Sequence, residues 1–447
     1  MAVFTSFIPF MKRFLIGAMT ALSAMSMMAE GYQINTLSAK QLGMGHTGTA
    51  LKLGSESMIF NPAALGFSNR TLDISGSVTG IKAIATADYN GGKYQTKNGI
   101  STPMAINASF RIYDNFQAGI SFYTPYGSAI DWTKDWPGAE LNQKVNLKVF
   151  TVQPTFAWRI TPKLSVGAGL MISWGNVNLD KALVSGRSFD ALMGAMGVPS
   201  NLGESAAASV NLKGTSDVAL GANVGIMYDI NSKWTVGADF RTRMQMKVPA
   251  GVAQVDYATE TARKVLEQKV GLINEANFSA AMPCPYVLNV GASFKPDERL
   301  TLAADVQLTG WKTYRTLNIE FPDNIKDFSQ HITKDYRNAM AYKIGAQYAL
   351  TDRFDLRAGL MIDTTPVNKN YYNPETPGMT KIEPTVGFSF RPIERLSIDF
   401  SFMYIAGTGE DDAKCTYMDL LTRQPVTFEA DYHVHAFAPA IGINYAF

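Results

Sequence analysis

The residues able to do chemistry are few and widely scattered in this 447-residue chain. His433 and His435 share one face of an extended strand at an i, i+2 spacing that could hold a metal ion, but the sequence offers no third ligand beside them. It contains no Gly-x-Ser-x-Gly elbow, phosphate loop, dinucleotide fingerprint or zinc-type cysteine pair. We therefore expect no enzyme activity, no metal and no cofactor. We also expect no bridge between the two cysteines, Cys284 and Cys415.

The composition narrows the class of protein. Charged residues make up 17% of the chain and aromatic residues 11%, whereas soluble globular chains carry about 25% charged residues. The formal net charge of +2 gives no basic excess that would attract nucleic acid. After the N-terminal leader, no apolar run reaches the roughly 20 residues of a transmembrane helix. A transmembrane β-barrel explains this combination, because its apolar residues alternate with polar lumen residues.

The N-terminus has the pattern of an export signal. Lys12 and Arg13 precede an apolar stretch, and Ala29 is a suitable cleavage residue. We predict that residues 1–29 form a signal peptide and that translation starts at Met11.

From residue 71 to 447 the chain alternates with the period of a β-strand. Between Phe354 and Asp363 every second residue is apolar, whereas Asp355, Arg357 and Asp363 share the opposite face. Charges on that face would be costly in a packed core, but they suit the polar interior of a barrel.

The connections predict the number of strands. Six of them are short polar turns and seven are long and irregular, which fits fourteen antiparallel strands with both chain ends on the short-turn side. The last strand ends at an aromatic residue, Phe447, as outer-membrane barrels do. The expected fold is an all-β transmembrane barrel over residues 71–447.

Two of the long loops, Ser188–Leu202 and Thr259–Ile273, carry many apolar residues. These include Phe189, Leu192, Met193, Met196, Val265, Leu266 and Val270. Two readings stay open for them: the loops pack on each other over the barrel mouth, or they form a landing site for a hydrophobic ligand.

The segment between the signal and the first strand resembles a known family. It contains Gly31-Tyr32-Gln33, then Leu42-Gly43-Met44-Gly45, then Asn61-Pro62-Ala63. In this order, the motifs resemble the N-terminal hatch of FadL-type outer-membrane transporters of long-chain fatty acids and hydrocarbons. Pro125-Tyr126-Gly127 and Asp363-Thr364-Thr365-Pro366-Val367 resemble downstream segments of that family.

The resemblance implies a fourteen-stranded barrel that residues 30–70 plug as a hatch. It implies that the two apolar loops capture the ligand, which then moves to a pocket beside the hatch. Asn61 matches a hatch residue next to that pocket, although a turn-forming role fits it equally well. Arg337 lies where the family tends to have a basic residue, and it could pair with a carboxylate or be a solvated loop charge. The family's next residue is Asp, and here it is Asn338.

The family also releases its ligand sideways, through a gap near an inward kink in the third strand. Here that strand spans about Phe116 to Tyr123, and the expected gate residues are Phe116, Ile120 and Phe122. A lateral exit keeps a long acyl chain out of water, since each buried CH₂ is worth about 0.8 kcal/mol.

The sequence therefore predicts passive uptake of long-chain fatty acids, or of similar hydrophobic compounds, across the bacterial outer membrane. The expected partners are the hydrophobic ligand, outer-membrane lipid and lipopolysaccharide, and the barrel assembly machinery, with the chain itself a monomer. A general porin, a barrel lipid hydrolase and a structural or adhesive barrel are the alternatives.

Overall fold

The computed structural model describes residues 31–447. The predicted signal peptide and the Met11 start lie outside the described residues. Among the described residues, no helix is long and apolar enough to cross a membrane.

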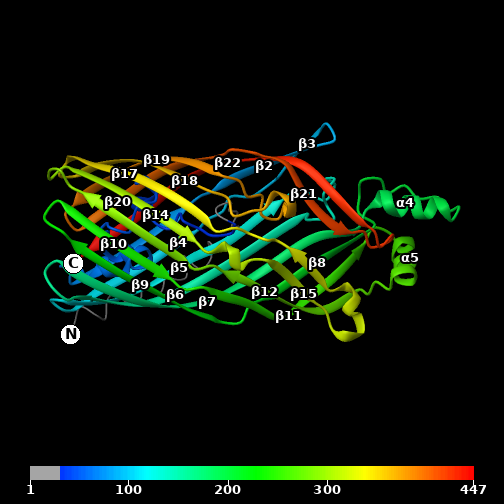
Figure 1. The fold of residues 1–447 in the computed structure, drawn as a ribbon, viewed down its shortest axis with the longest axis horizontal. Coiled ribbons are helices and arrows are strands. Elements are labelled where there is room, and N and C mark those ends of the chain that lie inside the picture. Colours follow the sequence, from blue (N-terminus) through cyan, green and yellow to red (C-terminus); the bar gives the residue numbers. More distant parts are fainter. Residues whose placement is uncertain (1–30) are drawn as a thin grey trace.

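Fourteen antiparallel strands form a closed barrel, in agreement with the count predicted from the turns (Figure 1). The last strand pairs with the first, from Asp73↔Ala446 to Thr79↔Ala440, and this pairing closes the ring. In ring order the strands are β1 (Leu72–Thr79), β4 (Met104–Tyr113), β5 (Phe116–Asp131), β6 (Lys144–Arg159), β7 (Leu164–Val184), β9 (Ala219–Asp229), β10 (Trp234–Arg241), β13 (Val287–Phe294), β14 (Leu300–Thr309), β17 (Ala339–Thr351), β18 (Phe354–Asp363), β19 (Lys381–Ile393), β20 (Leu396–Gly407) and β22 (Pro425–Ala446).

The outer face of the barrel is apolar and its inner face is polar. On β18, Leu356 is 47% exposed on the outside, whereas Asp355 and Arg357 are buried inside. Aromatic pairs lie near the short turns, among them Trp234–Phe294 with ring centroids 4.4 Å apart. An apolar outer band that ends in aromatic residues is the surface that a bilayer requires.

The two ends of the barrel differ, as Figure 1 shows. The turn end carries the six short turns and the C-terminus, and the loop end carries the long connections. At the loop end the sheet extends through β2 (Lys82–Tyr89), β3 (Gly92–Gln95), β8 (Ala208–Thr215), β11 (Met244–Tyr257), β12 (Glu275–Cys284), β15 (Thr316–Glu320), β16 (Gln330–Thr333) and β21 (Glu410–Met418). Its helices are α4 (Gly186–Ala195), α5 (Glu260–Val270), η3 (Trp311–Thr313), η4 (Asp323–Phe328) and η5 (Lys369–Tyr371).

Each of the two long loop helices starts at a capping side chain. Ser185 accepts a hydrogen bond from the backbone N–H of Ser188 ahead of α4. Thr259 accepts one from Ala262 ahead of α5, which ends at Gly271 in the left-handed conformation. These caps satisfy the free backbone groups of short helices that project beyond the barrel.

The N-terminal segment before β1 is buried inside the barrel. It folds into α2 (Ala39–Gly43), η1 (Gly54–Glu56), α3 (Ser57–Phe60) and η2 (Pro62–Phe67). Helix α2 packs on β19 and β20 on one side, and η2 packs on β6, β7 and β9 on the other. The segment therefore spans the lumen from wall to wall.

The N-terminal segment approaches the wall so closely that it needs glycine. Gly45 has a φ of +63°, and a Cβ there would lie 2.3 Å from the carbonyl oxygen of Ile344 on β17. No side chain fits in that space, and L-residues rarely adopt that φ.

Buried polar bonds fix the segment in place. The Oδ2 atom of Asp305 on β14 accepts hydrogen bonds from the backbone N–H groups of Gly48, at 2.7 Å, and Thr49, at 3.0 Å. The ammonium of Lys40 lies 3.6 Å from a carboxylate oxygen of Asp399 on β20.

We predict that Asp305→Ala loosens the N-terminal segment, because each buried N–H left without an acceptor costs about 1–3 kcal/mol. In planar bilayers the wild-type barrel should stay closed, and the variant should show bursts of conductance. Asp297→Ala is the matched control, because Asp297 accepts two backbone N–H groups in a short turn away from the segment. If Asp305→Ala shows no more conductance than the Asp297→Ala control, Asp305 does not anchor the N-terminal segment.

Candidate functional site: two neighbouring apolar cavities

The loop-end half of the barrel contains two apolar cavities. The outer cavity has a volume of about 440 Å³ and lies between the walls of β7, β8 and β11 and the loops that follow β15 and β21. Its apolar lining includes Leu183, Val210, Val255, Leu272, Phe321 and Phe328.

The inner cavity is smaller, at about 100 Å³, and lies closer to the N-terminal segment. Side chains of β6, β7, β11 and β12 line it, and Tyr32 of the N-terminal segment forms part of its wall. Its apolar lining includes Leu147, Val149, Val177, Met246, Phe278 and Leu317. Leu212 and Ile319 line both cavities, so one apolar surface runs from the loops to the N-terminal segment.

One ammonium group faces the outer cavity without a carboxylate partner. The Nζ atom of Lys181 donates to the amide oxygen of Gln330 at 3.2 Å. Among residues 31–447, no carboxylate oxygen lies within 4 Å of this ammonium. A positive charge at the edge of an apolar cavity attracts an anionic headgroup whose tail is hydrophobic.

Glu140 also lines the outer cavity, and two hydrogen-bond donors hold its carboxyl. Burial raises the pKa of its carboxyl, although hydrogen bonds from Tyr417, at 2.6 Å, and from the backbone of Ser185, at 3.2 Å, oppose that rise.

A second lysine, Lys334, is fully buried beside the inner cavity. It forms an ion pair with Glu375, the one charged residue among those that line the inner cavity in the described chain. The ammonium also lies 6.0 Å from the ring centroid of Tyr314. Because Glu375 neutralises Lys334, the inner cavity is close to neutral and suits an apolar group.

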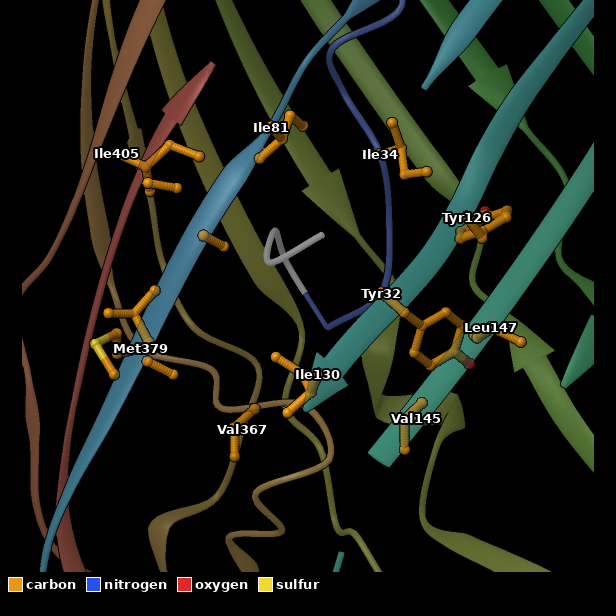
Figure 2. Packing of buried hydrophobic residues seen from close by; sticks show 14 of the residues in the cluster. Tyr32, Ile34, Ile81, Tyr126, Ile130, Val145, Leu147, Val367, Met379 and Ile405 are labelled. Atoms are coloured by element: carbon orange, nitrogen blue, oxygen red, sulfur yellow. The ribbon is translucent and has the colours of Figure 1, made fainter. Parts of the chain in front are cut away.

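Aromatic rings hold the N-terminal segment against the inner cavity. The ring of Tyr32 lies 4.7 Å from that of Trp311 and 6.1 Å from that of Tyr126, both in edge-on geometry. The Tyr32 hydroxyl donates to the carbonyl oxygen of Pro283. Figure 2 shows Tyr32 and Ile34 beside Tyr126 of β5 and Leu147 of β6.

The hydrogen-bond ladder between β4 and β5 is interrupted at this place. It ends at Ala105↔Tyr123, whereas β5 continues to pair with β6 as far as Asp131↔Lys144 after a bulge between Tyr123 and Tyr126. The freed edge of β5 pairs instead with the N-terminal segment. Ile34 N donates to Pro125 O at 2.8 Å, and Gly127 N donates to Tyr32 O at 2.9 Å.

The predicted gate residues lie on the turn-end side of this interruption. Phe116, Ile120 and Phe122 alternate along the outer face of β5, and Ile120 is 51% exposed. They border the lipid, and the break itself involves the residues from Tyr123 to Tyr126.

The seven apolar loop residues predicted to contact ligand line neither cavity. Phe189 and Met193 of α4 and Leu266 of α5 are buried in one small core, and Met196 is 48% exposed. Leu192, Val265 and Val270 are half-buried. Of the two loops, the second does reach the outer cavity, through Leu272 and Ile273 directly after α5.

Asn61 and Arg337 also lie away from both cavities. Asn61 is buried, and its amide donates to Thr49 O at 2.7 Å and to Ile226 O at 3.1 Å. The side chain of Arg337 is exposed. Sequence reasoning missed Lys181 and Arg423, which line the outer cavity, and Lys334, which pairs with Glu375 of the inner cavity.

Cys284 and Cys415 are both buried and free. His433 is exposed and His435 is half-buried. In the described part of the chain, no group of three or more histidine, cysteine or acidic side chains could hold a metal ion.

Comparison with known proteins decides the family. The model of the family described as outer membrane protein transport protein (OMPP1/FadL/TodX) matches residues 20–447. The chain belongs to this family. Its members are transport channels of the bacterial outer membrane and not enzymes, and they carry hydrophobic compounds as monomeric barrels. The loop end therefore faces the outside of the cell and the turn end faces the periplasm.

Individual relatives are distant but match over nearly their full length. The long-chain fatty acid transport protein of Escherichia coli K12 is 20% identical over 435 residues, which cover 93% of this chain and 94% of that protein. The crystal structure of a Pseudomonas aeruginosa FadL homologue has a TM-score of 0.77 at 18% identity and covers 93% and 100% of the two chains. The Pseudomonas putida toluene transporter TodX has a TM-score of 0.68 at 16% identity, covering 94% and 99%. At this identity the two structures show the shared fold.

We predict that Leu212→Trp blocks the connection between the cavities, because the larger ring would fill the narrow place that Leu212 and Ile319 share. Binding of a neutral fluorescent probe such as N-phenyl-1-naphthylamine to the purified barrel should weaken by about fivefold or more, since about 1 kcal/mol of contact is lost. Leu220→Trp on the outer face of β9 adds the same ring toward lipid and should leave binding unchanged. Equal binding by both variants would mean that the cavities are not connected.

Proposed function

We propose that this transporter takes up long-chain fatty acids, with the carboxylate held at Lys181 and the acyl chain lying along the apolar surface from the outer to the inner cavity. The unpaired ammonium of Lys181 at the edge of an apolar cavity is the observation that supports this most directly. A charge-assisted hydrogen bond contributes about 1.5–3 kcal/mol, and each methylene buried adds about 0.8 kcal/mol.

A neutral aromatic hydrocarbon is the second candidate. The inner cavity favours it, because the only charge in its described lining belongs to Glu375, which Lys334 neutralises. The two candidate ligands differ in whether the Lys181 ammonium contributes to their binding. A hydrocarbon has no group for the ammonium to bind and would gain from its removal.

The apolar residues of α4 and α5 have a supporting role in this proposal. Their shared core holds the two loop helices together above the outer cavity. Exposed Met196 at the end of α4 and Ile273 at the cavity rim provide first contacts for a ligand that arrives from outside.

Release follows a lateral route in this proposal. A ligand in the inner cavity lies against Tyr32, whose backbone occupies the free edge of β5. If the segment from Tyr32 to Ile34 moves off that edge, the interruption between β4 and β5 opens toward the bilayer. The acyl chain then enters lipid without crossing water. Among the described residues no nucleotide-binding motif is present, and the concentration gradient drives transport.

Uptake of labelled oleate by cells that lack their own transporter tests the function. Cells that produce this protein should take up oleate faster than cells that carry an empty vector. A folded barrel in the outer membrane without faster oleate uptake would overturn the proposal for fatty acids, and faster toluene uptake by those cells would favour the hydrocarbon.

We predict that Lys181→Met weakens oleate binding by about tenfold, because one charge-assisted hydrogen bond is lost. Binding of oleyl alcohol, which has the same chain and no charge, should change by less than about twofold. Lys264→Met, on the exposed face of α5, removes the same charge away from the cavity and is the control. Titration of the purified variants with both ligands measures these affinities. If Lys181→Met loses affinity for oleate and for oleyl alcohol to the same extent, the carboxylate does not bind at Lys181.

We predict that locking the N-terminal segment to β5 stops transport. Gln33 and Tyr126 are direct partners in an antiparallel bridge, which is a separation that a disulfide can span. The variant Gln33→Cys/Tyr126→Cys is made in a Cys284→Ser/Cys415→Ser background. Its oleate uptake should be low when oxidised and should recover on reduction, so that each protein is its own control. Uptake that is the same in both redox states would place the exit elsewhere.

A further inference from the structure

Four lysines with exposed or half-buried side chains form a continuous patch on the outside of the barrel at its extracellular end. They are Lys82 on β2, Lys97 in the connection from β3 to β4, and Lys144 and Lys148 on β6. We call them the lysine patch.

Hydrogen bonds and one ion pair join three members of the patch through the residues between them. Lys82 donates through its ammonium to the carbonyl oxygen of Asn98, which follows Lys97 in the chain. Lys97 N donates to Asp131 O at 2.7 Å, and the Asp131 carboxylate lies 3.0 Å from the ammonium of Lys144. Lys148 lies on the same face of β6 as Lys144, two outward-facing positions further along the strand.

The charges of the patch are only partly balanced. Among the described residues, Lys82, Lys97 and Lys148 have no carboxylate oxygen within 4 Å, and Lys144 has that of Asp131. Asp180 of β7, the cross-strand partner of Lys144, adds a second carboxylate, and its Oδ1 accepts from the amide of Asn211. Four positive charges against two negative charges leave the patch positive.

The lysines begin where the membrane band ends. Phe122, Phe150 and Trp174 pack together on the outer face, with ring centroids 6.0 to 6.5 Å apart. Lys148 is the next outward-facing residue on β6 after Phe150. Aromatic side chains of this kind lie at the level of lipid headgroups, so the lysines lie at the level of the phosphates above them.

We infer that the lysine patch binds the phosphate groups of lipopolysaccharide in the outer leaflet. That lipid carries its phosphates on sugars just above the acyl chains, where the patch lies, and lysine is a good point charge for phosphate. The patch flanks the interruption between β4 and β5 on both sides, because Lys82 and Lys97 lie before it in the ring and Lys144 and Lys148 after it. A bound lipopolysaccharide molecule would cover the outer mouth of this interruption. The inference rests on the outer-membrane location and holds whichever ligand the cavities take.

The test uses the full chain folded in detergent micelles and titrated with bisphosphorylated lipid A and with the same lipid after both phosphates are removed. The variant Lys82→Gln/Lys97→Gln/Lys148→Gln keeps the paired Lys144. Its Kd for bisphosphorylated lipid A should rise at least about tenfold, since each lysine near a charged lipid surface contributes about 1 kcal/mol. Its Kd for the dephosphorylated lipid should stay the same.

The control variant is Lys163→Gln/Lys233→Gln/Lys295→Gln, which removes three exposed lysines from the periplasmic turns. It should bind bisphosphorylated lipid A within about twofold of the wild type, because its lysines lie at the opposite end of the barrel. The wild-type barrel should also bind bisphosphorylated lipid A more weakly as the salt concentration rises. This measurement does not depend on whether a variant folds. Equal losses in both triple variants, equal wild-type affinity for the two lipids, or phosphatidylglycerol binding as tightly as lipid A would each overturn the inference.

Discussion

The structure depends on one constraint: inside a bilayer, every backbone N–H and C=O group needs a partner from the chain itself. Fourteen strands meet that constraint by closing on themselves between β1 and β22. Beyond Tyr123, β5 no longer pairs with its neighbour β4. The backbone of residues 32–34 forms hydrogen bonds with this free edge of β5 from inside the barrel. The N-terminal segment therefore completes the wall as well as filling the lumen. If the backbone of residues 32–34 moves away from β5, the wall opens at that edge.

The interior is divided along the barrel axis into two environments. Toward the periplasm, the wall carboxylates Asp305 and Asp399 bind the N-terminal segment, and Arg357 pairs with Asp399. Toward the outside, the strands that extend beyond the membrane turn apolar side chains inward and enclose the two cavities. Tyr32 lies at the boundary between these environments. A ligand thus meets the Lys181 ammonium at the outer cavity and then an apolar surface that leads to the part of the wall formed by the N-terminal segment.

Much of the fold was predictable because it follows from period-two alternation and from short polar turns. The number of strands, the interior position of Asp355, Arg357 and Asp363, and the family are confirmed. The apolar loop residues gave an ambiguous signal, because helices that pack on each other and helices that bind a ligand need the same pattern. In the structure most of them belong to the core between α4 and α5.

The residues at the cavities could not be read from the sequence, for three separate reasons. Lys181 follows Val177 and Leu179 on the inward face of β7, and that signal is visible only once the inward face is known. Lys334 and Glu375 come from two irregular loops, and their pairing depends on tertiary contact. The interruption at β5 leaves no trace in the alternation, because β5 continues to pair with β6 through the bulge.

In the proposed binding mode, an amphipathic anion lies across both cavities with its headgroup at Lys181 and its tail toward Tyr32. A crystal structure with a fatty acid brominated at the end of its chain tests this directly, because anomalous scattering locates the bromine without interpretation of weak lipid density. We expect a bromine peak in the inner cavity between Tyr32 and Phe278, with the carboxylate density at the Lys181 ammonium. Bromine peaks confined to the detergent belt, or to the periplasmic clefts beside Lys52 and Arg391, would contradict it.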